Sequence, residues 1–157
     1  MNARFERQIL MPQIGETGQA KLCDSSVLVV GCGGLGSTLL YALCGIGVGR
    51  IGFCDGDVVS LSNLNRQYLH TPDDIGRNKA QSAHEKLRAF APELVLEPHA
   101  FFLAQETALK LVPRYDLVLL AVDSLESRLI VNSACVETCV PLVDAGVDGL
   151  NGSLYTY

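Results

Sequence analysis

The glycine-rich turn GCGGLG at 31–36 constrains the fold of this chain more than any other feature. It follows the apolar run VLVV at 27–30 and precedes leucines at 35, 39, 40 and 43. The apolar run predicts a buried strand, and the leucine spacing predicts a helix that ends at Gly47 and Gly49. A strand that enters a helix through such a turn begins a βαβ unit and binds phosphate at the helix N-terminus. The feature therefore predicts an α/β protein.

Three glycines of this turn have separate expected roles. Gly31 permits the tight turn, Gly33 lets the backbone approach a phosphate, and Gly36 allows close helix packing. Asp55 lies 19 positions after Gly36, at the end of a second predicted strand, 51–54. An acid about 20 residues beyond the glycine loop binds ribose hydroxyls in such sites. At this point NAD and ATP are both compatible with the sequence.

The rest of the chain continues the alternation of helices and strands. We expect helices at 77–91, 105–112 and 125–138, and strands near Val95 and at 116–122, 141–145 and 152–157. This order predicts a Rossmann-like, doubly wound, mostly parallel sheet. We expect one nucleotide-binding domain over 1–157, with a helical N-terminal arm at 1–22 and the core at 23–157. The last predicted strand ends the chain, so further polypeptide or a second subunit is expected to cover that edge.

Composition excludes several classes of protein. The net charge of −5 argues against a protein that coats nucleic acid. The apolar runs are shorter than the roughly 20 residues that cross a membrane, and residues 1–10 lack the apolar stretch of a signal peptide, so we expect a cytoplasmic protein. The six cysteines contain no C-x-x-C pair, and we expect buried free thiols. Cys135 and Cys139 have the spacing of one helix face, which leaves a metal half-site open, although no further ligand supports it.

The segment DGDVVSLSNLNRQ at 55–67 carries more polar groups than a dehydrogenase needs. Beyond its two aspartates, Arg66 in this segment and Lys79 after it are cations that could hold a triphosphate, although Lys79 alone would pass for a solvated helix lysine. Asp123 follows the strand predicted at 116–122, where a carboxylate suits Mg²⁺ bound with nucleotide phosphates. Its alternative role is the N-cap of the next helix, which Ser124 could also provide.

Together these motifs resemble the ubiquitin-activating-enzyme-like adenylation family, the ThiF/MoeB/HesA group. The resemblance runs through RFERQI at 4–9, GCGGLG, GVGRIGFCDGDVVSLSNLNRQ, IGRNKA, AVDSLESR and VPLVDAG, which is nearly the whole chain. It implies ATP-dependent adenylation of the C-terminal carboxylate of a ubiquitin-fold sulfur carrier that ends in Gly-Gly. It also implies Mg²⁺ as cofactor, a homodimer, and a role in molybdopterin or thiamine biosynthesis.

The resemblance also assigns roles to individual residues. It places Gly34 against the phosphates, Asp55 at the ribose and Asp57 near it. Asn63 and Arg66 are expected to contact phosphate, Lys79 the triphosphate, and Asp123 the Mg²⁺ ion. Ser62 and Ser124 belong to the same nucleotide site, and Arg7 resembles an arginine that reaches into the ATP site of a dimer partner. By this resemblance Arg7, Arg66, Lys79 and Asp123 act in catalysis.

Some positions depart from the family pattern. Leu120 and Ser124 stand where the family often has a second acid and an asparagine, and the cysteines do not occupy the positions of the family's zinc site. Two other functions therefore stay open: a truncated, non-catalytic relative that binds nucleotide or a partner, and an adenylating dehydratase that modifies a tRNA nucleoside. An NAD-dependent oxidoreductase is least favoured, because it would not explain Asn63, Arg66 and Asp123 together.

Overall fold

The computed structural model describes residues 3–157 and contains one six-stranded sheet. The strands have the spatial order β3-β2-β1-β4-β5-β6. Neighbouring strands run parallel except for β5 and β6, which are antiparallel. This confirms the predicted mostly parallel sheet. The strands are β1 (Ser26–Val30), β2 (Arg50–Cys54), β3 (Val95–His99), β4 (Leu117–Leu120), β5 (Leu142–Asp148) and β6 (Asn151–Thr156).

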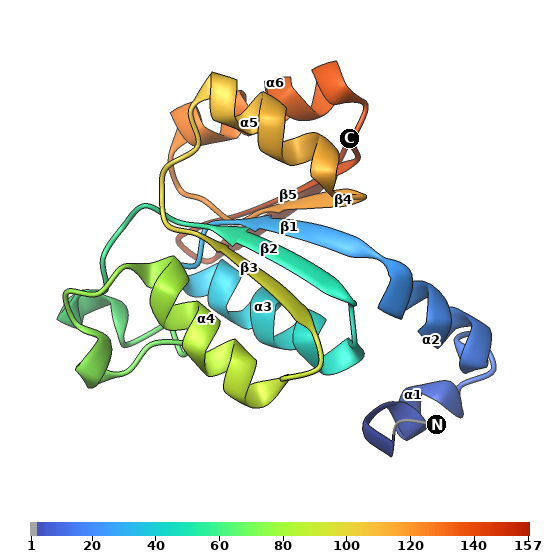
Figure 1. The fold of residues 1–157 in the computed structure, drawn as a ribbon. Coiled ribbons are helices and arrows are strands. Elements are labelled where there is room, and N and C mark those ends of the chain that lie inside the picture. Colours follow the sequence, from blue (N-terminus) through green and yellow to red (C-terminus); the bar gives the residue numbers. More distant parts are fainter. Residues whose placement is uncertain (1–2) are drawn as a thin grey trace.

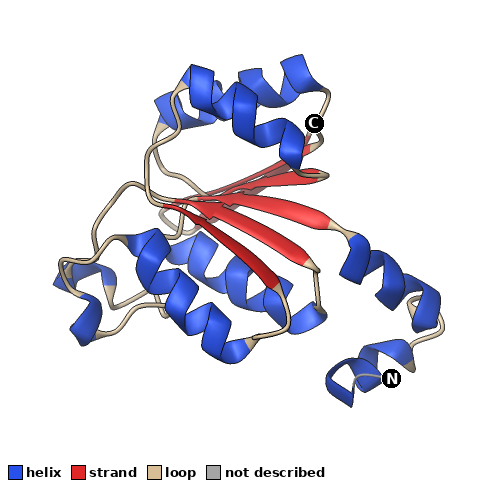
Figure 2. Cartoon of the chain, viewed as in Figure 1, coloured by secondary structure: helices blue, strands red, loops and turns tan. Residues whose placement is uncertain are grey.

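Helices cover both faces of the sheet, as a doubly wound fold requires (Figure 1). Helices α3 and α4 lie on one face and α5 and α6 on the other, which gives three layers (Figure 2). The helices are α1 (Glu6–Ile9), α2 (Gly15–Asp24), α3 (Gly34–Ile46), α4 (Lys79–Phe90), α5 (Gln105–Leu111) and α6 (Leu125–Thr138). Helix α3 ends as predicted, because Gly47 adopts the left-handed conformation (φ 83°) that closes a helix.

The core consists of two apolar clusters, one on each face of the sheet. Strand β1 contributes to both, because successive side chains of a strand point to opposite faces. Leu28 and Val30 pack with residues of α5 and α6. Val27 and Val29 pack with residues of α3 and α4. A strand buried on both faces reads as a continuous apolar run, which is why 27–30 predicted a strand without alternation.

The order of the elements separates the N-terminal arm from the glycine turn. Helices α1 and α2 lead into the start of β1 at Ser26, whereas the turn at 31–36 follows its end at Val30. Strands rise about 3.3 Å per residue, so the five residues of β1 place these features at opposite ends of the sheet. Figure 1 shows the arm beyond one end of the sheet and the long loop between β2 and α4 beyond the other.

The end of β4 differs from the prediction in two respects. The strand stops at Leu120 instead of Val122, so Asp123 lies in a loop and is exposed. Helix α6 is capped by Ser124, whose Oγ accepts a hydrogen bond from the Ser127 backbone N–H at 3.3 Å. The alternative role of Asp123 as the N-cap is therefore wrong. The carboxylate of Asp123 takes no part in starting the helix.

The cysteines correct two further predictions. All six are free, but Cys23 and Cys139 are exposed while the other four are buried. Cys139 lies just after α6 in the left-handed conformation (φ 56°), so it does not share a helix face with Cys135. Within residues 3–157 no group of three or more His, Cys, Asp or Glu side chains could hold a metal ion. None of the helices described there is long and apolar enough to cross a membrane.

Candidate functional site

Two glycines of the loop between β1 and α3 are required by the fold itself. Gly31 has φ 100°, and a Cβ atom there would lie 2.6 Å from the carbonyl oxygen of Ala121. A Cβ atom on Gly36 would lie 1.8 Å from the carbonyl oxygen of Gly31. Both contacts are with backbone atoms that cannot easily move. These two residues therefore give the turn its shape and let α3 start close to the sheet.

Gly33 and Gly34 have no comparable structural requirement. The nearest atom to a Cβ on Gly33 would be Gln67 Nε2 at 3.7 Å, and on Gly34 it would be Arg66 Cγ at 3.6 Å. These are ordinary contact distances. Helix α3 begins at Gly34, and no side chain caps its N-terminus. The first N–H groups of the helix are thus open to a ligand, and such a terminus attracts anions.

Asp55 is hydrogen-bonded to the glycine loop. Its Oδ2 accepts a hydrogen bond from the Cys32 backbone N–H at 2.8 Å. Its Oδ1 accepts one from the Asp57 backbone N–H, also at 2.8 Å. The pairing of β1 with β2 brings these segments together, since Val30 lies opposite Cys54. The carboxylate is therefore held at the side of the loop, where the spacing of the motif predicted a ribose ligand.

Lys79 and Asp57 form an ion pair at the same edge of the sheet. The distance from Lys79 Nζ to Asp57 Oδ2 is 3.0 Å, and the side-chain exposure is 8% for Lys79 and 56% for Asp57. Asn78 fixes this position: its Oδ1 caps α4, and its Nδ2 donates to the backbone oxygens of Asp55 at 3.0 Å and Asp57 at 3.2 Å. Lys79 is thus a buried cation beside the acidic turn. The alternative interpretation of Lys79 as a solvated helix lysine is therefore wrong.

The Arg66 side chain runs past Gly34 and is exposed. Its Nη1 donates to the Ser62 carbonyl oxygen at 3.1 Å and to Asn65 Oδ1 at 2.9 Å. These partners are local, so the guanidinium is free to reorient. Asn63 Oδ1 accepts a hydrogen bond from the Ser60 backbone N–H at 3.1 Å and shapes the turn. Phosphate contacts of Ser62, Asn63 and Arg66 stay predictions.

Arg128 fixes the loop that carries Asp123, and it is a residue that sequence reasoning missed. Its Nη1 pairs with Asp144, and its Nη2 donates to the carbonyl oxygens of Val122 at 2.5 Å and Ala145 at 3.0 Å. Because β4 lies beside β1, this loop follows the same sheet edge as the glycine turn. A single carboxylate here fits Mg²⁺, which commonly takes one or two carboxylates together with nucleotide phosphates.

His70 is a second residue that sequence reasoning missed. It is buried, with Nδ1 at 2.9 Å from Ser82 Oγ and Nε2 at 3.3 Å from the Cys32 carbonyl oxygen. Burial lowers the pKa of His70, so the ring is neutral at pH 7. A carbonyl oxygen only accepts, so Nε2 carries the proton and Nδ1 accepts from Ser82. The ring thereby links the glycine loop to α4, through contacts between residues far apart in the chain.

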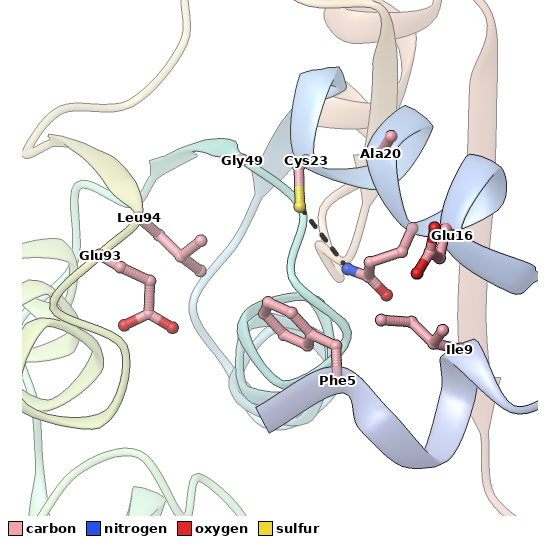
Figure 3. Close-up of a pocket in the computed structure, with 9 residues that line it drawn as sticks. Phe5, Ile9, Glu16, Ala20, Cys23, Gly49, Glu93 and Leu94 are labelled. Atoms are coloured by element: carbon pink, nitrogen blue, oxygen red, sulfur yellow. Dashed lines mark hydrogen bonds between the residues drawn. The ribbon is translucent and has the colours of Figure 1, made fainter. Parts of the chain in front are cut away.

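Arg7 lies away from these residues. It is an exposed residue of α1, in the arm at the opposite end of the sheet. The arm and the residues just before β2 and β3 line an open cavity of about 570 Å³ (Figure 3). Phe5, Ile9, Gln19 and Leu94 are among its lining residues. None of the predicted site residues lines this cavity, and the structure does not bring Arg7 together with the other predicted site residues of its own chain.

The remaining predicted residues gather at one edge of the sheet. Hydrogen bonds or close approach connect the glycine loop with Asp55, Asp57, Arg66 and Lys79. The profile of the ThiF family matches residues 5–157 of the sequence. The chain belongs to the ThiF family. The family profile covers almost the whole chain, and the matched region includes the glycine loop, the turn with Asp55 and Asp57, and Lys79.

Known proteins similar to this ThiF-family chain include two curated relatives. It is 43% identical over 154 residues to the adenylyltransferase and sulfurtransferase MOCS3 of Danio rerio, covering 98% of this chain and 34% of that protein. It is 46% identical over 156 residues to the protein of the same name from Mus musculus, again covering 98% and 34%. The chain thus spans about a third of the length of these relatives.

Solved structures give the same fold. One is E. coli tRNA N6-threonylcarbamoyladenosine dehydratase, TcdA, in complex with AMP, with a TM-score of 0.87 and 29% identity. The match covers 94% of this chain and 61% of that one. A doubly wound fold of this class binds its ligands at the carboxyl ends of the strands. In the ThiF-family chain described here, that is the edge where the predicted residues gather.

Proposed function

We propose that this chain is the ATP-binding part of an enzyme that adenylates the C-terminal carboxylate of a ubiquitin-fold sulfur carrier. The observation that carries the proposal is the uncapped N-terminus of α3, with the Asp55 carboxylate and the buried Lys79 cation beside its glycine loop. The family and the MOCS3 relatives, which are named adenylyltransferases, support the same reaction.

In this proposal the nucleotide lies along the sheet edge. Its phosphates occupy the N-terminus of α3, where Gly33 and Gly34 leave room for them. Asp55 accepts hydrogen bonds from the ribose hydroxyls, and Asp57 holds Lys79 until a phosphate competes for the ammonium. Arg66 turns from its local partners toward the phosphates. The remaining contributions come from Ser62, Asn63, Asp123 and Ser124.

The chemistry then needs little from the protein beyond positioning and positive charge. A carboxylate oxygen of the carrier attacks the α-phosphorus of ATP, an acyl–phosphate bond forms, and the bond to the departing pyrophosphate breaks. Negative charge develops on the pyrophosphate, which Lys79 and Arg66 are placed to stabilise. Mg²⁺ held by Asp123 and the phosphates would neutralise part of the same charge.

The position of Arg7 supports a homodimer in which the arm of one subunit completes the site of the other. The arm lies at the far end of the sheet from its own glycine loop, so it cannot serve that loop directly. The six free cysteines are compatible with a reducing compartment such as the cytoplasm.

The test is isotope exchange between pyrophosphate and ATP in the presence of candidate carriers that end in Gly-Gly. We expect carrier-dependent exchange, and a loss of about 10²-fold in Arg66→Ala, because one lost charge-stabilising group costs roughly 3 kcal/mol in the transition state. The fold should survive, since Arg66 binds only Ser62 and Asn65. Arg88→Ala, an exposed arginine on α4, is the matched control and should exchange normally. Unchanged exchange in Arg66→Ala would contradict the assignment.

One observation favours a second candidate. One solved structure that resembles this chain with a TM-score of 0.87 is a tRNA dehydratase with bound AMP. Such an enzyme could use the same nucleotide residues on a nucleoside carboxylate. Exchange between pyrophosphate and ATP that depends on added tRNA, in the absence of any carrier, would favour that branch. If the chain binds ATP but shows no exchange with either a carrier or tRNA, the non-catalytic relative is favoured, because its site would only bind the nucleotide.

A further inference from the structure

Gln67 carries a buried amide that the fold leaves without a hydrogen-bond partner. The residue is 4% exposed. Its Oε1 is the only buried side-chain oxygen or nitrogen without a partner found in residues 3–157. The backbone of Gln67 is fixed, because its N–H donates to the Asn63 carbonyl oxygen at 3.0 Å. The unpaired Oε1 is an acceptor whose burial costs free energy in the chain without ligand, and the donor Nε2 of the same amide also makes no hydrogen bond within residues 3–157.

The amide lies at the glycine loop. Its Nε2 would be 3.7 Å from a Cβ atom on Gly33, the residue that precedes α3. The neighbouring residue Arg66 runs past Gly34, where its Cγ would lie 3.6 Å from a Cβ atom on that glycine. Consecutive residues therefore bring a neutral donor and a cation to the uncapped helix N-terminus. An anion placed there would meet the N–H groups of α3, the guanidinium and the Gln67 amide together.

Gln19 shows what a buried glutamine looks like when it serves the fold. It is 5% exposed, almost the same as Gln67. Its Nε2 donates to the Ile46 carbonyl oxygen at 3.1 Å and approaches Cys23 Sγ at 3.6 Å, and its Oε1 accepts from Gln8. Its polar atoms join the arm to the end of α3. Gln67 has the same burial and no such bonds.

We propose that Gln67 is a phosphate-binding residue, whose Nε2 donates a hydrogen bond to a phosphate oxygen of the nucleotide seated on the N-terminus of α3. This inference rests on the proposed ATP site and adds a residue to it. A neutral donor suits the position, because a buried cation would be far more costly in the absence of ligand. Methionine removes the donor without adding a charge, whereas glutamate replaces it with a carboxylate that repels the phosphates, so Gln67→Glu should bind ATP more weakly than Gln67→Met.

The experiment compares thermal unfolding and ATP titration in four chains: the unaltered chain, Gln67→Met, Gln67→Glu and Gln19→Met. Methionine keeps the length of glutamine and removes its polar atoms. For Gln67→Met we expect an unfolding midpoint without ligand that is unchanged or higher, and a Kd for ATP raised about tenfold, which corresponds to the loss of one hydrogen bond. For Gln67→Glu the Kd should rise further, through repulsion of the phosphates.

The control should behave in the opposite way. Gln19→Met breaks satisfied bonds far from the glycine loop, so the unfolding midpoint should fall while the Kd for ATP stays unchanged. If Gln67→Met lowers the midpoint as Gln19→Met does, or does not fold, the amide serves the fold and the inference is wrong. If the unaltered chain binds ATP and Gln67→Met binds it equally well, the inference fails while the proposed function stands. If the unaltered chain does not bind ATP, both fail.

Discussion

Replacing Lys79 by methionine separates the electrostatic role of this lysine from its structural role. The ammonium lies 3.0 Å from Asp57, with 8% of the lysine side chain exposed and 56% of the aspartate side chain. Methionine retains most of the apolar stem, which packs at the start of α4. The aspartate left behind stays in contact with water. The substitution therefore removes a cation from the nucleotide site without leaving a buried, unpaired charge.

The two expected magnitudes differ widely. A pair with one exposed partner contributes about 1 kcal/mol or less, and an apolar replacement of a buried charge is often neutral, so the free energy of unfolding should change by less than about 1 kcal/mol. If the ammonium stabilises the charge that develops on pyrophosphate, its loss costs roughly 3 kcal/mol in the transition state. The exchange rate between pyrophosphate and ATP should then fall about 10²-fold in Lys79→Met.

Two other lysines serve as controls in the same assays, urea unfolding and carrier-dependent exchange. Lys86 pairs with Asp74, whose side chain is 1% exposed and also pairs with Arg77, so Lys86→Met removes one of two cations from a buried carboxylate and should cost about 2 kcal/mol of stability. Its exchange rate per folded molecule should be normal. Lys110→Met, an exposed lysine paired with Glu106, should change neither quantity. Exchange within about threefold of normal in Lys79→Met would refute the role of the cation.

Two further predictions concern pH and thiol chemistry. Burial acts to raise the pKa of Asp74, but hydrogen bonds from Lys86 and Thr71 outweigh it and hold the pKa far below the unfolded value of about 3.9. The stabilisation by the ionised Asp74 is therefore complete above the unfolded pKa and is lost as the pH falls. The free energy of unfolding, measured in urea, should thus fall less between about pH 5 and about pH 2 in Asp74→Asn than in the unaltered chain. Two thiols, those of Cys23 and Cys139, should react rapidly with iodoacetamide in the folded chain, and the four buried thiols only on unfolding. Mass spectrometry of the alkylated chain measures this, and rapid alkylation of more than two thiols would contradict the burial of the other four.

Much of the fold was predictable because each strand and helix is encoded locally. The run at 27–30 is apolar on both faces, and Gly47 and Asn78 mark helix ends by known preferences. The end of β4 was harder to predict. Ala121 and Val122 continue the apolar run, but the strand stops at Leu120, and the close approach of Gly31 to the Ala121 carbonyl oxygen marks where the chain turns away. Such contacts depend on the folded arrangement and leave no local signal.

The candidate site was predictable only where the motif itself supplies the residue. Asp55 followed from its distance to the glycine loop. Arg128 did not, because its partners are carbonyl oxygens and a carboxylate that only the assembled sheet brings together. The positions of exposed cysteines also escaped prediction, since Cys139 precedes Val140, Leu142 and Val143 in the sequence, although it is exposed where helix α6 ends. The burial of a side chain depends on how the whole chain packs, so the few residues on either side of it in the sequence predict it poorly.

The residues missed from the sequence explain how the site is rigid before any nucleotide binds. Asp55 accepts from the Cys32 N–H, and His70 binds the carbonyl oxygen of the same Cys32. His70 in turn accepts from Ser82 on α4, the helix that begins at Lys79. The glycine loop, Asp55 and the helix that carries Lys79 are thus joined through the backbone of Cys32 and one imidazole. A group held in this way needs no reorganisation when charge develops on a bound phosphate, which is the condition under which a fixed cation contributes most to a reaction.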